Sequence, residues 1–152
     1  MRMRKIMGFF LALVMFMGFL SLNPIVSYAN DDANNDVEIN STNFPDNNFR
    51  DYVKRRYDAD GDDKLSKREL EQVTRIELPR RRGGFSSLKG IEYFKKLKTL
   101  ICYGNHLTHL DVSHNTELTL LDCGTNQLTS LDLSKNPNLT TLDCNQNRLT
   151  SL

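Results

Sequence analysis

The chain has 152 residues, with 20 Lys or Arg against 19 Asp or Glu, and a formal net charge of +1. Three of the basic residues lie in an apolar N-terminal segment, so the remainder carries a slight acidic excess. This balance argues against a nucleic-acid partner. The length is enough for one domain.

The first 29 residues are predicted to be a secretory signal peptide. Arg2, Arg4 and Lys5 precede an apolar run from Ile6 to Leu22, and small residues before a cut after Ala29 complete the pattern. A retained membrane anchor is the alternative, but a run of about 17 residues is at the lower limit for a span. We therefore expect a secreted or cell-surface protein without stable membrane insertion after cleavage.

A disordered leader is predicted over residues 30–38, because this segment is acidic and rich in Asn. A helical cap is expected over residues 39–74. Within it, Asn43 to Asp46 has the composition of a helix start. One face of the helix that follows carries Phe49, Tyr52, Val53 and Tyr57.

The segment from Asp58 to Glu69 has the spacing of an EF-hand calcium loop. Carboxylates occupy places one, three, five and twelve, a hydroxyl occupies place nine, and place seven offers its carbonyl. Such a set of oxygens suits Ca²⁺ better than Mg²⁺. The predicted ligands are Asp58, Asp60, Asp62, Lys64, Ser66 and Glu69.

The sixth place of this loop departs from the pattern. It holds Asp63 where Gly is usual, because the turn requires a positive φ. Asp adopts that conformation at a cost of about 1 kcal/mol, which predicts a weakened site. Extracellular calcium would still fill it. An acidic turn that binds no metal is the alternative interpretation.

After an irregular first repeat over residues 75–96, the chain repeats every 21 residues from Leu97 to an incomplete coil at Leu152. Leucines recur at the same four places of each coil, a fixed period that indicates a stacked solenoid. The pattern is identified as a leucine-rich repeat. Two further sets coincide, namely Cys102, Cys123 and Cys144, and Asn105, Asn126 and Asn147.

Each coil divides into two halves of similar spacing, so two short parallel strands per coil are predicted. The expected fold class is α+β, a leucine-rich-repeat solenoid with a small helical cap. Leu121 and Cys123 are predicted to point inward because alternate strand residues face opposite ways. The cysteines are expected to form a buried thiol ladder, and the asparagines to bond backbone at the corners.

The outward strand positions form the predicted partner-binding surface. Solenoid sheets commonly present extended surfaces of this kind. The candidates are Thr99, Ile101, Tyr103, Leu120, Asp122, Gly124, Thr141, Asp143 and Asn145.

Residues 39–152, from NFPDNNF through SSLKGIEYFKKLKTL to the coils, resemble the N-terminal part of secreted leucine-rich-repeat proteins of Firmicutes, with an internalin-like layout. The resemblance implies a secreted or cell-surface interaction protein. We accordingly predict a non-catalytic adhesion module with a calcium-stabilised cap, because no nucleophile, base and orienting group coincide. Its expected partner is an extracellular or host-surface protein, or a glycan.

Two alternatives remain open. The chain stops in mid-coil, which is compatible with a targeting segment of a larger secreted enzyme. A basic patch made of Arg80, Arg81 and Arg82 with Lys95, Lys96 and Lys98 could instead bind an anionic glycan or wall polymer.

Overall fold

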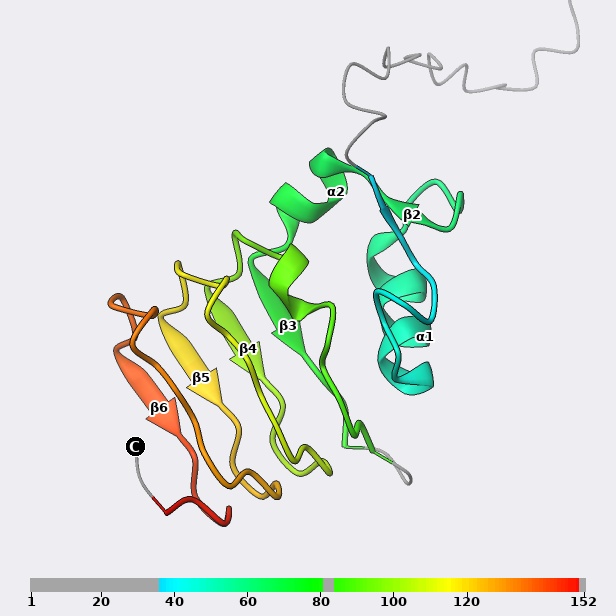
Figure 1. Cartoon of the computed structure of the whole chain (residues 1–152). Helices are drawn as coiled ribbons and strands as arrows, with labels where there is room; N and C mark the ends of the chain where they lie inside the picture. Colours follow the sequence, from blue (N-terminus) through cyan, green and yellow to red (C-terminus); the bar gives the residue numbers. More distant parts are fainter. Residues whose placement is uncertain (1–35, 81–83, 151–152) are drawn as a thin grey trace, which may run out of the picture. The chain divides into compact units, whose positions relative to one another are not determined.

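The computed structural model describes residues 36–80 and 84–150. The predicted signal peptide, positions 30–35 of the predicted leader, and Arg81 and Arg82 lie outside the described residues. The described chain begins with a small cap of two helices and continues into a four-stranded sheet (Figure 1).

The cap is a helix–loop–helix unit. Helix α1 spans Asn47–Tyr57 and α2 spans Lys67–Gln72, while β1 (Val37–Glu38) pairs antiparallel with β2 (Lys64–Leu65). As expected, α1 starts after Asp46, whose side chain accepts a hydrogen bond from Phe49 N. Ser66 and Glu69 form a capping box at the start of α2.

The predicted leader boundary at residue 38 is wrong. Val37 and Glu38 lie in β1, opposite Leu65 and Lys64. The acidic, Asn-rich composition of the segment does not reveal this strand, because the strand is only two residues long and depends on β2 for its pairing.

The sheet contains one strand from each successive coil. Its strands β3 (Arg75–Glu77), β4 (Thr99–Ile101), β5 (Leu120–Asp122) and β6 (Thr141–Asp143) are all parallel and lie in chain order. The register places Ile76, Leu100, Leu121 and Leu142 in one row. The 21-residue period thus aligns equivalent residues directly. In the irregular first repeat, a short 3₁₀ helix, η1 (Ile91–Tyr93), precedes β4.

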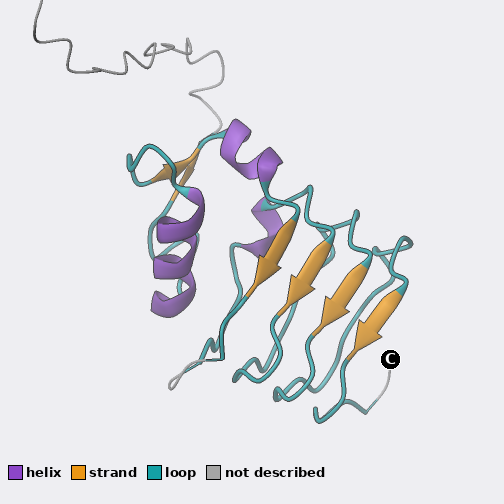
Figure 2. Cartoon of the chain, turned by 180° about the vertical axis from the view of Figure 1, so that it is seen from behind, coloured by secondary structure: helices purple, strands orange, loops and turns teal. Residues whose placement is uncertain are grey.

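The prediction of two strands per coil is wrong. Among the described residues, the second half of each coil forms no strand, and the chain returns as loop behind the sheet (Figure 2). Its inward residues Leu110, Val112 and Leu131 are nevertheless buried. Asn115 and Asn136 join neighbouring coils there in place of strand-to-strand hydrogen bonds. Each side-chain amide donates two hydrogen bonds to backbone carbonyls of the preceding coils.

The predicted corner ladder of asparagines is present beside the strands. Asn126 Nδ2 donates to the carbonyls of Cys102, Cys123 and Gly124, and its Oδ1 accepts from Leu107 N at 3.0 Å. Asn105 and Asn147 make corresponding contacts. These amides satisfy backbone groups that turn away from the sheet while buried.

The three cysteines are free and stack in successive coils. Cys102 and Cys123 are buried, whereas Cys144 in the last described coil is half-buried. Burial raises the pKa of the Cys102 thiol well above its ordinary value, and it raises the pKa of Cys123 to about 12. Thiols with raised pKa stay protonated at neutral pH, as expected of residues that serve as small apolar side chains.

Helix α1 closes the β3 edge of the sheet. The Tyr52 hydroxyl donates to Glu77 O at 3.1 Å, and the Tyr57 hydroxyl donates to Arg75 O at 3.3 Å. Their rings also contact Phe85 and Phe94, with centroids 6.2 and 5.4 Å apart respectively. The cap therefore supplies partners to carbonyls that an edge strand would otherwise leave unpaired.

Asp46 joins the cap to the first repeat. Its Oδ2 accepts hydrogen bonds from Ser86 N (2.8 Å), Ser86 Oγ (2.6 Å) and Ser87 N (3.2 Å), while Oδ1 caps α1. Burial alone would raise the pKa of Asp46, but these hydrogen bonds outweigh it and the pKa is lowered. The ionised carboxylate thus stabilises the fold.

Asp46→Asn is expected to lower the free energy of unfolding by about 1.5–3 kcal/mol at pH 7, because an amide cannot replace the charged acceptor for three donors. Since the folded-state pKa is depressed, the wild-type advantage should persist above pH 4 and disappear as pH falls through the folded-state pKa, below 3.8. Urea unfolding of both proteins across this pH range measures the effect. A constant difference down to pH 2 would contradict the assigned role.

Candidate functional site

The outward residues of the strands form one continuous surface, here called the outer face. In register, Thr99, Leu120 and Thr141 make one row, and Ile101, Asp122 and Asp143 make the next. Thr141 and Asn145 are exposed, Gly124 is buried, and the other predicted partner-binding residues are half-buried. The structure therefore brings all the predicted partner-binding residues to one side of the sheet.

A groove of about 390 Å³ lies at the β3 side of the outer face. Arg80 lines it, with its guanidinium carbon over the Tyr103 ring, 5.0 Å from the ring centroid. Gly104 makes this approach possible, because a Cβ at Gly104 would lie 2.7 Å from Arg80 Nε. The groove is lined by Glu77, Leu78, Pro79, Arg80, Ile101, Tyr103 and Asp122.

The sequence pattern does not place Arg80 on the outer face. The available signal was Gly104, which stands where the later coils have Thr125 and Gln146. All three residues have positive φ, at 70°, 51° and 55° respectively. Gly alone combines that conformation with space for a neighbouring side chain.

Gly124 lies beside Tyr103 on the same face. Gly124 has no side chain, and a Cβ built on it would lie 3.1 Å from Tyr103 Cδ2 and 3.2 Å from Asp143 Oδ1. The Tyr103 ring and the Asp143 carboxylate therefore occupy the space that a side chain at this position would need.

The described residues of the predicted basic patch, Arg80, Lys95, Lys96 and Lys98, do not form one surface. Arg80 follows β3, whereas Lys95, Lys96 and Lys98 precede β4. Because the strands are parallel, these positions lie at opposite ends of the sheet (Figure 1). Lys96 also pairs with Glu117, with Nζ 2.7 Å from Oε1.

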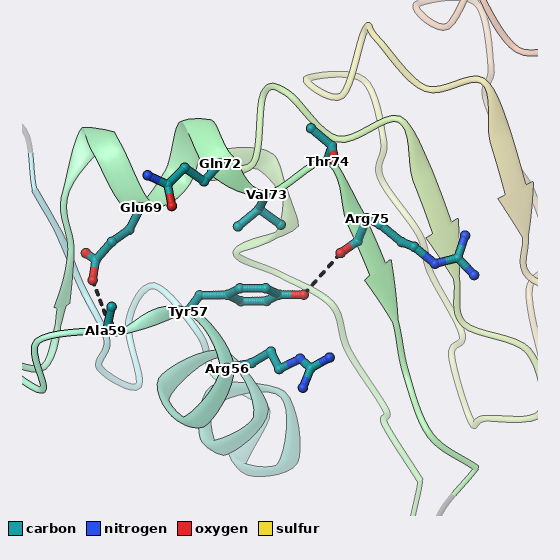
Figure 3. A pocket seen from close by; sticks show the side chains of 8 residues that line it. All are labelled: Arg56, Tyr57, Ala59, Glu69, Gln72, Val73, Thr74 and Arg75. Carbon is teal, nitrogen blue, oxygen red and sulfur yellow. Dashed lines mark hydrogen bonds between the residues drawn. The ribbon is translucent and has the colours of Figure 1, made fainter.

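The predicted calcium loop brings together three of its six proposed ligands. Asp58, Asp60 and Glu69 each offer a carboxylate oxygen, and these atoms lie within 4.8 Å of one another. Glu69 Oε1 accepts a hydrogen bond from Ala59 N at 2.7 Å, and both residues line a hollow of about 400 Å³ (Figure 3). Helix α2 thus reaches back to the start of the loop.

The other three proposed ligands have different contacts. Asp62 Oδ1 accepts from Lys64 N at 2.9 Å, Lys64 itself lies in β2, and Ser66 Oγ donates to Glu69 Oε2 at 2.8 Å. The turn has the geometry that the sixth place requires, since Asp63 has a φ of 66°. Asp63 also pairs with Lys54.

The sequence is similar to Internalin J of Listeria monocytogenes serotype 4b, with 33% identity over 73 residues, which are 48% of this chain and 8% of that protein. The solved functional domain of InlJ from L. monocytogenes, which includes a cysteine ladder, matches 76% of this chain at 33% identity and a TM-score of 0.52. An internalin structure, InlF from L. monocytogenes 4b F2365, matches 79% of this chain at 28% identity and a TM-score of 0.69.

These similarities are partial in length. The chain spans 30% of the InlJ structure and 35% of the InlF structure. No protein-family model matches the sequence. None of the helices among the described residues has the length and apolarity needed to cross a bilayer.

Proposed function

We propose that residues 36–150 form a non-catalytic protein-interaction module of a secreted or cell-surface protein, and that the outer face binds the partner. The similarity to internalins and the parallel stacking of coils support this proposal. A targeting segment of a larger secreted enzyme would use the same face, so the proposal concerns binding under either interpretation.

The observation that carries the proposal is the placement of Ile101, Tyr103 and Leu120. All three side chains are half-exposed on the outer face, and none belongs to the buried core. Equivalent places in other coils hold small or polar residues such as Thr141, Asp143 and Asn145. Large apolar and aromatic side chains dominate the energy of protein interfaces, which makes these three the expected anchors.

Tyr103→Ala is expected to weaken binding of the partner about tenfold or more, because it removes the central aromatic anchor. The partner is first captured from an array of extracellular and host-surface proteins, and its affinity is then measured by surface plasmon resonance. Tyr103→Phe is the matched control and should retain binding, since it keeps the ring. Full binding by a correctly folded Tyr103→Ala protein would contradict the proposed face.

The cap is further proposed to bind Ca²⁺ weakly. Asp58, Asp60 and Glu69 would hold the ion, since they are hard oxygen ligands whose atoms already lie close together. When bound, Ca²⁺ would neutralise these carboxylates and join the loop to α2. Glu69 would have to exchange its hydrogen bond from Ala59 N for a metal contact, which is compatible with a weak site.

Calcium at ten times its dissociation constant is expected to stabilise the protein by about 1.4 kcal/mol, or about 4 °C in melting temperature. Glu69→Gln should abolish most of this increment, and Glu71→Gln, which alters an exposed residue of the same helix, should retain it. The increment is compared within each variant because Glu69 also caps α2. No shift at millimolar calcium, or an equal shift with magnesium, would contradict the assignment.

A further inference from the structure

Arg80 is held at the β3 side of the outer face without an acidic partner. Its side chain is exposed, and its guanidinium lies over the Tyr103 ring. Within residues 36–80 and 84–150, Arg80 forms no ion pair, whereas Arg75 pairs with Glu77 at 2.8 Å. The groove beside Arg80 therefore contains a positive charge that no described carboxylate neutralises.

Two separate features hold this arginine in place. One is the ring of Tyr103, and the other is the missing side chain of Gly104. A Cβ at Gly104 would lie 2.7 Å from Arg80 Nε, 3.2 Å from its Cδ and 3.3 Å from its Cγ. Since Thr125 and Gln146 occupy the equivalent positions at positive φ, the turn itself does not require glycine. Glycine is needed here because the length of Arg80 occupies the space.

A guanidinium held in this way is suited to bind a carboxylate. The Tyr103 ring attracts its positive charge but supplies no oxygen acceptor, and no residue of the described chain accepts a hydrogen bond from it. Its N–H groups form a fork that can donate two parallel hydrogen bonds to one carboxylate. Because the side chain is already held in place, less conformational entropy is lost when such a ligand binds.

The groove has room for the residues around that carboxylate. Its volume is about 390 Å³, and Leu78, Pro79 and Ile101 line it together with the charged side chains. These three residues offer an apolar surface next to Arg80. An apolar side chain beside the carboxylate of a ligand would lose its contact with water there.

The two acidic residues of the groove decide which side suits the carboxylate. Glu77 is already paired with Arg75. Asp122 lies on β5, which β4 separates from the β3 side, and its Oδ1 accepts from Gly124 N at 3.2 Å. A carboxylate on the β3 side would meet Arg80, whereas one on the β5 side would meet Asp122 and be repelled.

We propose that the protein partner places an aspartate or glutamate side chain against Arg80, and that an apolar residue next to it lies against Leu78, Pro79 and Ile101. This inference rests on the proposed function, because it uses the same outer face, and it adds the chemistry that the partner presents at the β3 side. The charge of Asp122 would disfavour partners with a continuous acidic surface.

A random dodecapeptide library displayed on phage tests this inference, with the purified protein as bait. We expect Asp or Glu next to apolar residues to be enriched among the binders. Synthetic versions of the selected peptides should bind Arg80→Gln about tenfold more weakly, because this variant lacks both the charge and the fork. The matched control is Arg148→Gln, which removes an exposed arginine that does not line the groove. It should bind normally.

Two further variants test the placement of Arg80 and the sign of the charge that is recognised. Gly104→Ala keeps every charge but puts a methyl group against Arg80 Nε, so it should also weaken the selected peptides about tenfold. Asp122→Asn removes a charge of the same sign as that of the peptide, so it should bind at least as tightly as the wild type. Thermal melting confirms that each variant is folded.

Peptides that lack acidic residues but lose binding on Tyr103→Ala would overturn the carboxylate inference and leave the proposed face intact. Acidic peptides that bind Arg80→Gln as tightly as the wild type would also overturn it, since another part of the surface would hold their carboxylate. Binding weakened about tenfold by Asp122→Asn would show that the groove recognises a cation instead. No enrichment, or binding unaffected by any outer-face variant, would count against both proposals.

Discussion

Leu121→Asp is expected to unfold the solenoid. Leu121 is fully buried in β5, between Leu100 of β4 and Leu142 of β6. An aspartate there would place a carboxylate in the core with no partner, at a cost of about 3–5 kcal/mol or more. A small domain is stable by about 5–15 kcal/mol, so this loss removes much of its stability. Circular dichroism and thermal melting measure the outcome.

Thr141→Asp is the matched control because it introduces the same side chain on the exposed side of β6. Its effect should stay below about 1 kcal/mol, the range of strand-surface substitutions. Equal destabilisation by the two variants would show that the inward and outward sides of the strands are wrongly assigned.

Asn126→Asp is expected to be the second most damaging change, although it alters only one atom. The amide nitrogen of Asn126 donates to three carbonyls, at 3.0, 3.0 and 3.1 Å. An ionised carboxylate would place an oxygen, which cannot donate, against those three carbonyl oxygens. The buried carbonyls would then have no hydrogen-bond donor from this side chain. The expected loss is about 3 kcal/mol or more at pH 7.

The pH dependence of this variant has a definite sign. Burial among carbonyls would raise the pKa of the introduced carboxyl above its unfolded value, so the variant should regain part of its stability as pH falls through that raised pKa. Asn138→Asp is the control, since Asn138 is exposed and makes one contact, to Thr116 O at 3.2 Å. Guanidinium unfolding at pH 5 and pH 7 compares them. A variant equally stable at both values would contradict the donor role.

Sequence reasoning predicted those parts of the fold that have a repeated or strongly directional signal. The 21-residue period placed Leu100, Leu121 and Leu142 in one row because stacking converts a period into alignment. The segment ending at Asp46 marked the start of α1 because a short polar side chain there has a specific donor to satisfy. These features depend on residues close in sequence or related by the repeat.

The remainder depends on contacts that no local pattern specifies. The two halves of each coil have similar spacing, yet Asn115 and Asn136 take over the bonds between coils in the second half. In the candidate site, the outward residues could be predicted, but the stacking of Arg80 on Tyr103 could not, since it joins an irregular first repeat to a regular one. The arginine and the lysines of the expected basic patch lie apart because Arg80 follows one parallel strand and the lysines precede the next. Their closeness in sequence does not reveal this separation.

The difference between the two halves of a coil has a consequence for how such a chain can lengthen or shorten. Gain or loss of a full 21-residue unit would add or remove one strand and extend or shorten the outer face by about 4.8 Å, with every neighbour still meeting its equivalent. Gain or loss of a half unit would place the loop half of one coil, which is joined to its neighbours by Asn115 or Asn136, against the strand half of the next. The two halves could not pair in this way, although their sequences have similar spacing. Recombination among genes of this type should therefore preserve whole units, and the length of the binding surface should vary in steps of one strand.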